Sequence, residues 1–255
     1  DKVVEADVIS RKVIRKLALV GAPFGLALDG KGERLYVTCR DGDRVVAVDT
    51  KDFKEVESIE VGAAPVAIAF CATKAGERLV VANSISDNIS VLAVAPFQEL
   101  ARPLAGREPY SVAVAQDGSV AFVANRLAVP ETHLTVADSE LTLLDPARGR
   151  ILLRQPFESA HLAEGTATVP GRPWSLTPLV KVRNLVPITQ VANGWVMSSG
   201  LAVADYQGNI VQMPLDEAED YFADPSGIAV DAAGKRAYVA SGGGDVVSVV
   251  DLDRL

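Results

Sequence analysis

The sequence contains little cysteine, histidine or aromatic residue, and these shortages exclude several classes of protein. Its 255 residues include two cysteines and two histidines, and aromatic residues make up 5%. Cys39 and Cys71 are too few for a disulfide framework and lack the Cys-x-x-Cys spacing of redox motifs. No apolar run reaches the ~18 residues that a bilayer-spanning helix requires, so the sequence predicts no transmembrane segment.

Clustered positive charge is also lacking. The formal net charge is −8, and the 25 Lys and Arg residues are scattered along the chain. A surface that binds nucleic acid needs clustered basic residues to displace phosphate counterions, so nucleic acid is not an expected partner. No nucleophile elbow, His-Glu-x-x-His pair or P-loop occurs, and the sequence therefore identifies no catalytic residue. Hydrophobic residues make up 49%, which is typical of a packed globular chain.

What the sequence does contain is an internal repeat. Four segments begin at a proline and consist of an apolar stretch, a polar turn and a second apolar stretch. They are 23–39, 65–83, 109–125 and 225–241, with offsets from first to last residue of 16, 18, 16 and 16. Their Gly-containing turns and β-branched content predict pairs of antiparallel strands.

Further strands follow each pair, for example residues 44–49 and 55–61. Four strands in about 40–45 residues is the pattern of one propeller blade. The sequence therefore predicts an all-β protein, a β-propeller forming one domain over 1–255. The expected units are 21–62, 63–106, 107–161, 162–223 and 224–255. The fourth of these is degenerate, with first and second strands expected at 162–169 and 172–179.

The two ends of the chain predict an incomplete ring. Residues 3–7 and 12–17 resemble the third and fourth strands of a further blade (1–20), whereas the last unit contains strands one to three. Two third-type strands cannot share one blade. We therefore expect this chain to be a fragment of a larger ring; a closed five-bladed ring with one displaced strand is the alternative.

Two insertions, 126–138 and 180–197, lengthen the connection between second and third strands. Long loops in a compact repeat are often functional, and both should project from one rim. The expected binding rim comprises Asn83, Asn125, Arg126, His133, Lys181, Arg183 and Trp195. Alternatively, the insertions merely plug the channel or cover a blade edge.

The second strands carry a family resemblance. Residues 35–39, 80–83, 122–125 and 238–241 resemble the Tyr-Val-Thr-Asn signature of the YVTN-type bacterial β-propellers. Residues 185–195 resemble a segment of YVTN propellers that are fused to c-type haem, cytochrome c peroxidase-like domains. The resemblance implies an exported, for example periplasmic, protein. Covalent haem attachment needs Cys-x-x-Cys-His, which this chain lacks, so the resemblance implies that any haem lies beyond Leu255.

Two functional hypotheses follow. The first is a non-catalytic scaffold, the propeller portion of an exported redox protein, with no cofactor in this chain and a protein partner or downstream domain on the insertion-bearing face. The alternative is a lactonase-type hydrolase with a metal at the channel mouth, towards which Asn83 and Asn125 would converge. Two metal sites are less favoured: a metal shared by His133 and His161, and calcium at 216–220. A cell-surface adhesion module is the third functional hypothesis.

The cysteines are expected to be unpaired. Cys39 closes a second strand and Cys71 a first strand of the next blade, so they should lie near opposite faces. A strand length of about 15 Å exceeds the ~7 Å that a disulfide allows between Cα atoms. The sequence predicts two free, mostly buried thiols.

Overall fold

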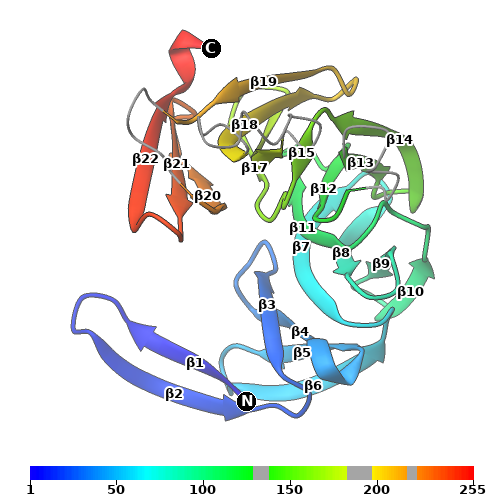
Figure 1. Ribbon diagram of the computed structural model, residues 1–255. Helices are drawn as coiled ribbons and strands as arrows, with labels where there is room; N and C mark the ends of the chain where they lie inside the picture. Colours follow the sequence, from blue (N-terminus) through cyan, green and yellow to red (C-terminus); the bar gives the residue numbers. More distant parts are fainter. Residues whose placement is uncertain (129–137, 183–196, 217–222) are drawn as a thin grey trace.

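The computed structural model describes residues 1–128, 138–182, 197–216 and 223–255. Within them the chain forms six antiparallel sheets, two single-turn 3₁₀ helices and no α-helix. The sheets stand side by side around an arc, with the first strands nearest its middle (Figure 1). The expected all-β propeller fold is therefore confirmed.

Three sheets are complete four-stranded blades. Blade 1 contains β3 (Pro23–Leu28), β4 (Arg34–Cys39), β5 (Arg44–Asp49) and β6 (Lys54–Glu60). Blade 2 contains β7 (Pro65–Thr73), β8 (Gly76–Asn83), β9 (Asn88–Ala93) and β10 (Gln98–Ala101). Blade 3 contains β11 (Pro109–Val114), β12 (Ala121–Asn125), β13 (Ser139–Asp145) and β14 (Arg150–Phe157).

The other three sheets differ from this pattern. Blade 4 contains β15 (Ala160–His161), β16 (Ala167–Thr168), β17 (Trp174–Val182), β18 (Met197–Asp205) and β19 (Ile210–Pro214). Blade 5 contains β20 (Pro225–Val230), β21 (Arg236–Ser241) and β22 (Val246–Asp251). The N-terminal hairpin contains β1 (Lys2–Asp7) and β2 (Lys12–Ala18).

Blade 4 corrects one expectation. A single first strand over 162–169 is wrong, because β15 and β16 pair separately with β17. Leu162 adopts a positive φ of 53°, which interrupts extended backbone. Gly165 lies so close to blade 5 that a Cβ there would be 2.3 Å from the Ser226 carbonyl oxygen. The second strand also begins later and runs further than expected, from Trp174 to Val182.

A glycine with left-handed backbone closes the first turn of four blades. Gly32, Gly118, Gly171 and Gly234 have φ values of 71°, 68°, 74° and 66°. Glycine adopts this region without the steric cost that a Cβ imposes. The polar turns expected from the sequence therefore contain glycine because their backbone is left-handed at that position.

The core lies between neighbouring blades. Tyr36 and Val45 of blade 1 are 2% and 0% exposed and pack against Leu79 of blade 2. Phe122 of blade 3 is fully buried against blade 4, together with Leu179. Burial of each such side chain contributes about 1.5–3 kcal/mol, so each blade is stabilised mainly by its neighbours.

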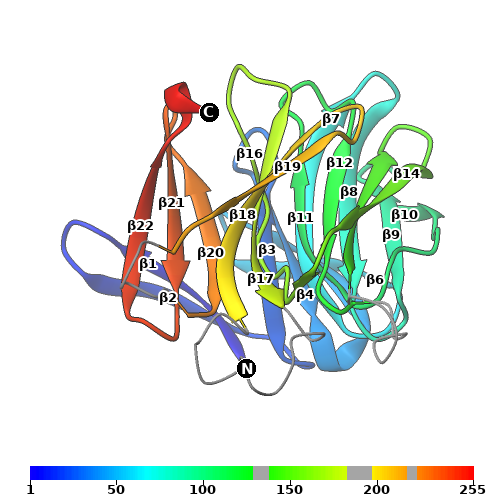
Figure 2. The ribbon, with the colours of Figure 1, turned by 45° about the horizontal axis from the view of Figure 1, so that its top comes forward.

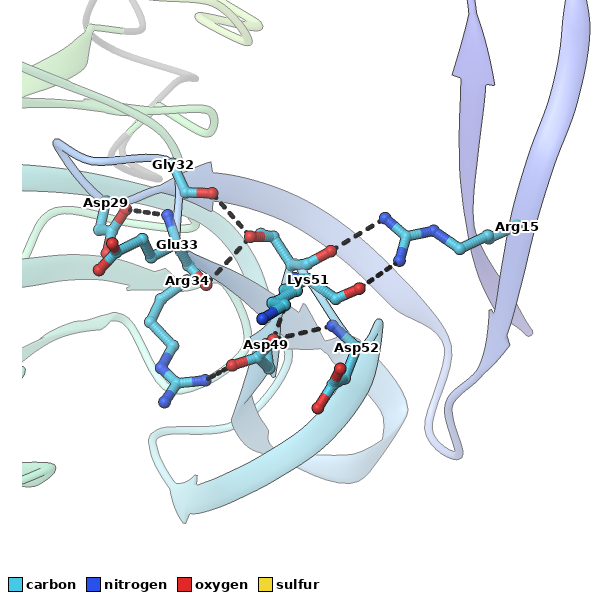
Figure 3. A network of polar contacts seen from close by, with 9 residues as sticks. Arg15, Asp29, Gly32, Glu33, Arg34, Asp49, Lys51 and Asp52 are labelled. Atoms are coloured by element: carbon cyan, nitrogen blue, oxygen red, sulfur yellow. Dashed lines mark hydrogen bonds and ion pairs between the residues drawn. The ribbon is translucent and has the colours of Figure 1, made fainter.

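The N-terminal hairpin is docked on blade 1. Arg15 on β2 donates hydrogen bonds of 2.9 and 2.7 Å to the carbonyl oxygens of Thr50 and Lys51, in the turn after β5 (Figure 3). Its guanidinium carbon also lies 4.8 Å from the centroid of the Phe53 ring. Val3 is buried against blade 1. The hairpin thus packs against the face of blade 1 that contains Val37 and Val46.

The two cysteines are free and buried, which confirms that prediction. Burial raises the pKa of Cys71 to about 11 and also raises the pKa of Cys39. Neither thiol therefore has the thiolate character that reactivity requires. Among the described residues, no helix is long and apolar enough to cross a membrane.

Candidate functional site at the channel mouth

One backbone arrangement recurs where blades 1, 2, 3 and 5 begin. The residue before the first-strand proline is left-handed, with φ values of 54°, 53°, 51° and 55° at Ala22, Ala64, Glu108 and Asp224. Its carbonyl accepts a hydrogen bond of 2.8–3.0 Å from the backbone N–H that follows the second strand of the same blade. These pairs place two side chains per blade at the same edge of the sheet. We call this edge the channel mouth.

An aspartate directly before the third strand of one blade secures the linker to the next. Asp43 accepts a 2.8 Å hydrogen bond from the N–H of Ala64, and Asp87 accepts one of 2.7 Å from the N–H of Glu108. The left-handed region is unfavourable for residues with a Cβ, and the residue before proline is restricted further. The two hydrogen bonds on each linker residue offset that cost and fix the linker.

Two arginine–aromatic pairs lie at the mouth. The Arg40 guanidinium is 5.4 Å from the Phe24 ring centroid, and the Arg126 guanidinium is 5.2 Å from that of Tyr110. Both pairs line a cavity of about 570 Å³ that blades 1 to 3 enclose. Blade 2, between them, contributes Ile85, whose side chain is 76% exposed. The combination offers charged, aromatic and apolar contacts within one hollow.

Arg126 lies at the centre of this site. It donates hydrogen bonds of 2.7 Å to Glu108 and of 2.7 Å to Glu164 on blade 4. The hydrogen bond that Arg126 donates to Glu108 is the main cause that raises the pKa of Arg126 above its ordinary value. Arg126 also lines a second cavity of about 320 Å³ with Glu164 and Asp224. This residue therefore connects the hollow over blades 1 to 3 with the surface of blades 4 and 5.

His161 lies beside this arginine. Its Nδ1 accepts a 3.3 Å hydrogen bond from the backbone N–H of Ala128. Burial, followed by the nearby charges of Arg126 and Arg107, lowers the pKa of His161. The folded protein therefore holds this imidazole in its neutral form.

We expect His161 to make folding stability depend on pH. A histidine with a lowered folded pKa contributes stability above its unfolded value of about 6.5, and that contribution falls as the pH decreases. The unfolding midpoint in urea, measured from about pH 8 to about pH 5, should decline less in His161→Gln than in the unsubstituted chain. The two chains differ only at position 161, so the comparison isolates His161; parallel declines would contradict the expectation.

The structure separates the residues of the sequence-predicted rim. Arg126 lies at the channel mouth. Lys181 lies within β17 and donates a 3.0 Å hydrogen bond to Gln212 on β19, so its ammonium lies over the sheet of blade 4. His133, Arg183 and Trp195 lie outside the described residues.

Asn83 and Asn125 are fully buried inside their own blades. The Asn83 amide donates to Asn88 and Ser90, and the Asn125 amide donates to Thr142 and the Glu140 carbonyl. Their side chains join the second strand to the third. The hydrolase hypothesis instead requires these amides to converge on the channel.

Several residues of the site carry a signal that sequence reasoning missed. Arg40 and Arg126 each follow the last residue of a Tyr-Val-Thr-Asn-like segment, and Phe24 and Tyr110 each follow the proline that begins a unit. Comparison of these positions across units would have paired each arginine with its ring. Glu164 gives no such signal, because blade 4 is degenerate.

No cluster of three or more His, Cys, Asp or Glu side chains suited to a metal occurs in the described part of the chain. Cys39 and Cys71 are buried and 32 positions apart in the sequence, so they do not fit covalent c-type haem. These two cysteines therefore do not provide a site for covalent haem attachment.

The sequence and the structure were each found to be similar to known proteins. A scan of known protein families found no match. Over 115 residues, 44% of this chain, the sequence is 27% identical to hydrazine synthase subunit beta of Kuenenia stuttgartiensis, and the aligned part spans 30% of that relative. Hydrazine synthase from the same organism superposes with a TM-score of 0.87 at 22% identity, over 99% of this chain and 71% of that one. The Neurospora crassa Pan2 WD40 domain superposes with a TM-score of 0.69 at 12% identity, over 100% and 71%. These similarities, with the repeated four-stranded sheets, identify the chain as a β-propeller.

Proposed function

We propose that the chain is a non-catalytic scaffold that binds a protein partner across the channel mouth. The observation that carries this proposal is the pair of arginine–aromatic contacts on either side of the exposed Ile85. Arg and Tyr are enriched among residues that dominate protein–protein binding energy. A cavity with mixed charge and apolar surface suits a protein loop.

The relative supports a role within an assembly. Its name, hydrazine synthase subunit beta, describes one subunit of an enzyme. We extend this to the present chain as a proposal: it is the propeller part of a larger redox assembly, in a compartment outside the cytoplasm. The YVTN-type resemblance and a c-type haem domain beyond residue 255 belong to this proposal.

The test compares assembly size between variants expressed in the native source. Ile85→Glu and Arg40→Ala should reduce the fraction of chain that elutes in a complex, because loss of an interface anchor commonly weakens binding by 2 kcal/mol or more, about 30-fold. Both side chains are well exposed, so folding should be unchanged. Val56→Glu, on the outer strand of blade 1 and 46% exposed, is the matched control.

Two results would count against the proposal. One is an unchanged complex in both channel-mouth variants; the other is equal loss in the Val56 control. The intact mass and visible spectrum of the purified complex test the redox part separately, since covalent haem adds both mass and absorbance.

A further inference from the structure

A cavity of about 520 Å³ lies between blades 2 and 3, away from the channel mouth. Its lining comes from the turns after β7 (73–75) and β11 (117–119) and from the β13–β14 turn (145–150), with Leu152 beside them. Because β7 and β11 begin at the channel mouth, the turns that follow them lie at the opposite edge of the sheets. Figures 1 and 2 show these two blades side by side, each with another sheet on its far side.

The interface between blades 2 and 3 differs from the interfaces on either side. Ring pairs close those two interfaces: Tyr36 with Phe97 between blades 1 and 2, at 6.0 Å, and Phe122 with Tyr206 between blades 3 and 4, at 5.7 Å. Val80 takes the place of Tyr36, three residues before the end of its second strand, and Gly149 takes that of Phe97, directly before the fourth strand. A Cβ at Gly149 would lie 2.5 Å from the Cβ of Ala101, so no ring fits there.

Three cationic side chains line the cavity, one from blade 2 and two from blade 3. Lys74 is exposed, and its ammonium makes no direct ion pair with any described residue. Arg148 and Arg150 lie 2.9 and 3.7 Å from the same Asp145 oxygen, and their side chains are 71% and 64% exposed. All three therefore keep donors that are free to bind a ligand.

The two carboxylates at the cavity are held by their own turns. Asp117 accepts hydrogen bonds of 3.0 and 2.7 Å from the backbone N–H and the hydroxyl of Ser119. Asp145 accepts hydrogen bonds of 3.0 and 3.2 Å from the backbone N–H groups of Ala147 and Arg148. Three positive and two negative groups leave the cavity with an excess of positive charge, in a chain whose formal net charge is −8.

The chemistry of these groups suits an oxyanion. A guanidinium presents planar donors that match a carboxylate or a phosphate, and an ammonium adds a compact charge. Leu152, which is 41% exposed, gives the same cavity an apolar wall. The volume lies in the range of small-molecule sites, about 300–1,000 Å³.

We propose that this cavity binds a small organic oxyanion, a carboxylate or a phosphate, between Lys74 of blade 2 and Arg148 and Arg150 of blade 3. The apolar part of the ligand packs against Leu152. The bound anion bridges two blades at the interface that has no ring pair. This site is separate from the channel mouth and independent of the partner proposed there.

The test uses three probes with the same alkyl chain: hexanoate, hexyl phosphate and hexanol. Each is titrated into the purified chain while the amide chemical shifts of residues 73–75 and 117–119 are followed by NMR. At least one of the two anions should give saturable shifts in both turns, and the tighter of them identifies the headgroup. Hexanol should give none. Absence of saturation with both anions, or equal shifts with hexanol, would overturn the proposal.

Matched substitutions test the two sides of the cavity. Lys74→Met and Arg150→Met should each weaken binding of the anion by about tenfold or more, because each removes a charged donor and keeps a long apolar side chain. Both side chains are exposed, so the circular dichroism spectrum and the unfolding midpoint should not change. Lys54→Met is the control, since Lys54 is exposed and takes the place of Arg150 in blade 1. Equal weakening in this control would show a general effect of charge and would contradict a site between blades 2 and 3.

Discussion

Replacement of Phe122 by alanine should lower the free energy of unfolding by about 3–5 kcal/mol, the usual loss for a buried phenylalanine. The ring is fully buried between blades 3 and 4 and lies 5.7 Å from the Tyr206 ring. Alanine would leave a cavity at an interface that stabilises both blades. Urea unfolding followed by circular dichroism measures the loss as a lower midpoint.

Tyr238→Ala is the matched control for this effect. Tyr238 has the same place in its blade but is 37% exposed, so its loss should cost about 1 kcal/mol. Similar losses in the two variants would show that blade 5 is covered in solution.

Gly118→Ala should destabilise the protein by about 2–4 kcal/mol, through two effects that act together. The residue has a φ of 68°, which is unfavourable for alanine. A Cβ would also lie 2.1 Å from the Ala72 carbonyl oxygen in blade 2, so the turn of blade 3 would have to move away from its neighbour. Thermal or urea unfolding measures the change.

Gly32→Ala separates these effects. Gly32 occupies the same turn of blade 1 with a φ of 71°, and no atom lies within 4 Å of the position a Cβ would take. Only the backbone cost of about 1 kcal/mol should remain. Equal losses at the two glycines would mean that the contact between the blade 3 turn and blade 2 does not contribute to stability.

Most of the fold could be predicted from the sequence, because its signals are local. Alternation of apolar residues marks a strand, and a glycine two or three residues before the next strand marks a turn. Both signals repeat in blades 1, 3 and 5. The expectation failed in blade 4, where Leu162 and Gly165 interrupt the first strand to contact other blades. Such an interruption depends on neighbours that are distant in sequence.

The candidate site was predictable only in part. Arg126 was expected at the rim because it begins an insertion, and the structure places it at the channel mouth. Its partners Glu108 and Glu164 lie 18 and 38 residues away in the sequence and meet it through separate blades. Asn83 was also expected at the rim, but its amide is enclosed within blade 2.

The sequence by itself determined the repeat, the number of strands in most units and the absence of a haem-attachment motif, because each depends on residues close together in the chain. Tertiary structure alone decided which equivalent residues are buried. Tyr36, Phe122 and Tyr238 occupy one position of the repeat, yet only Tyr238 is substantially exposed. The physical reason is that a blade buries its face against the next blade, and that neighbour is a property of the assembled arc.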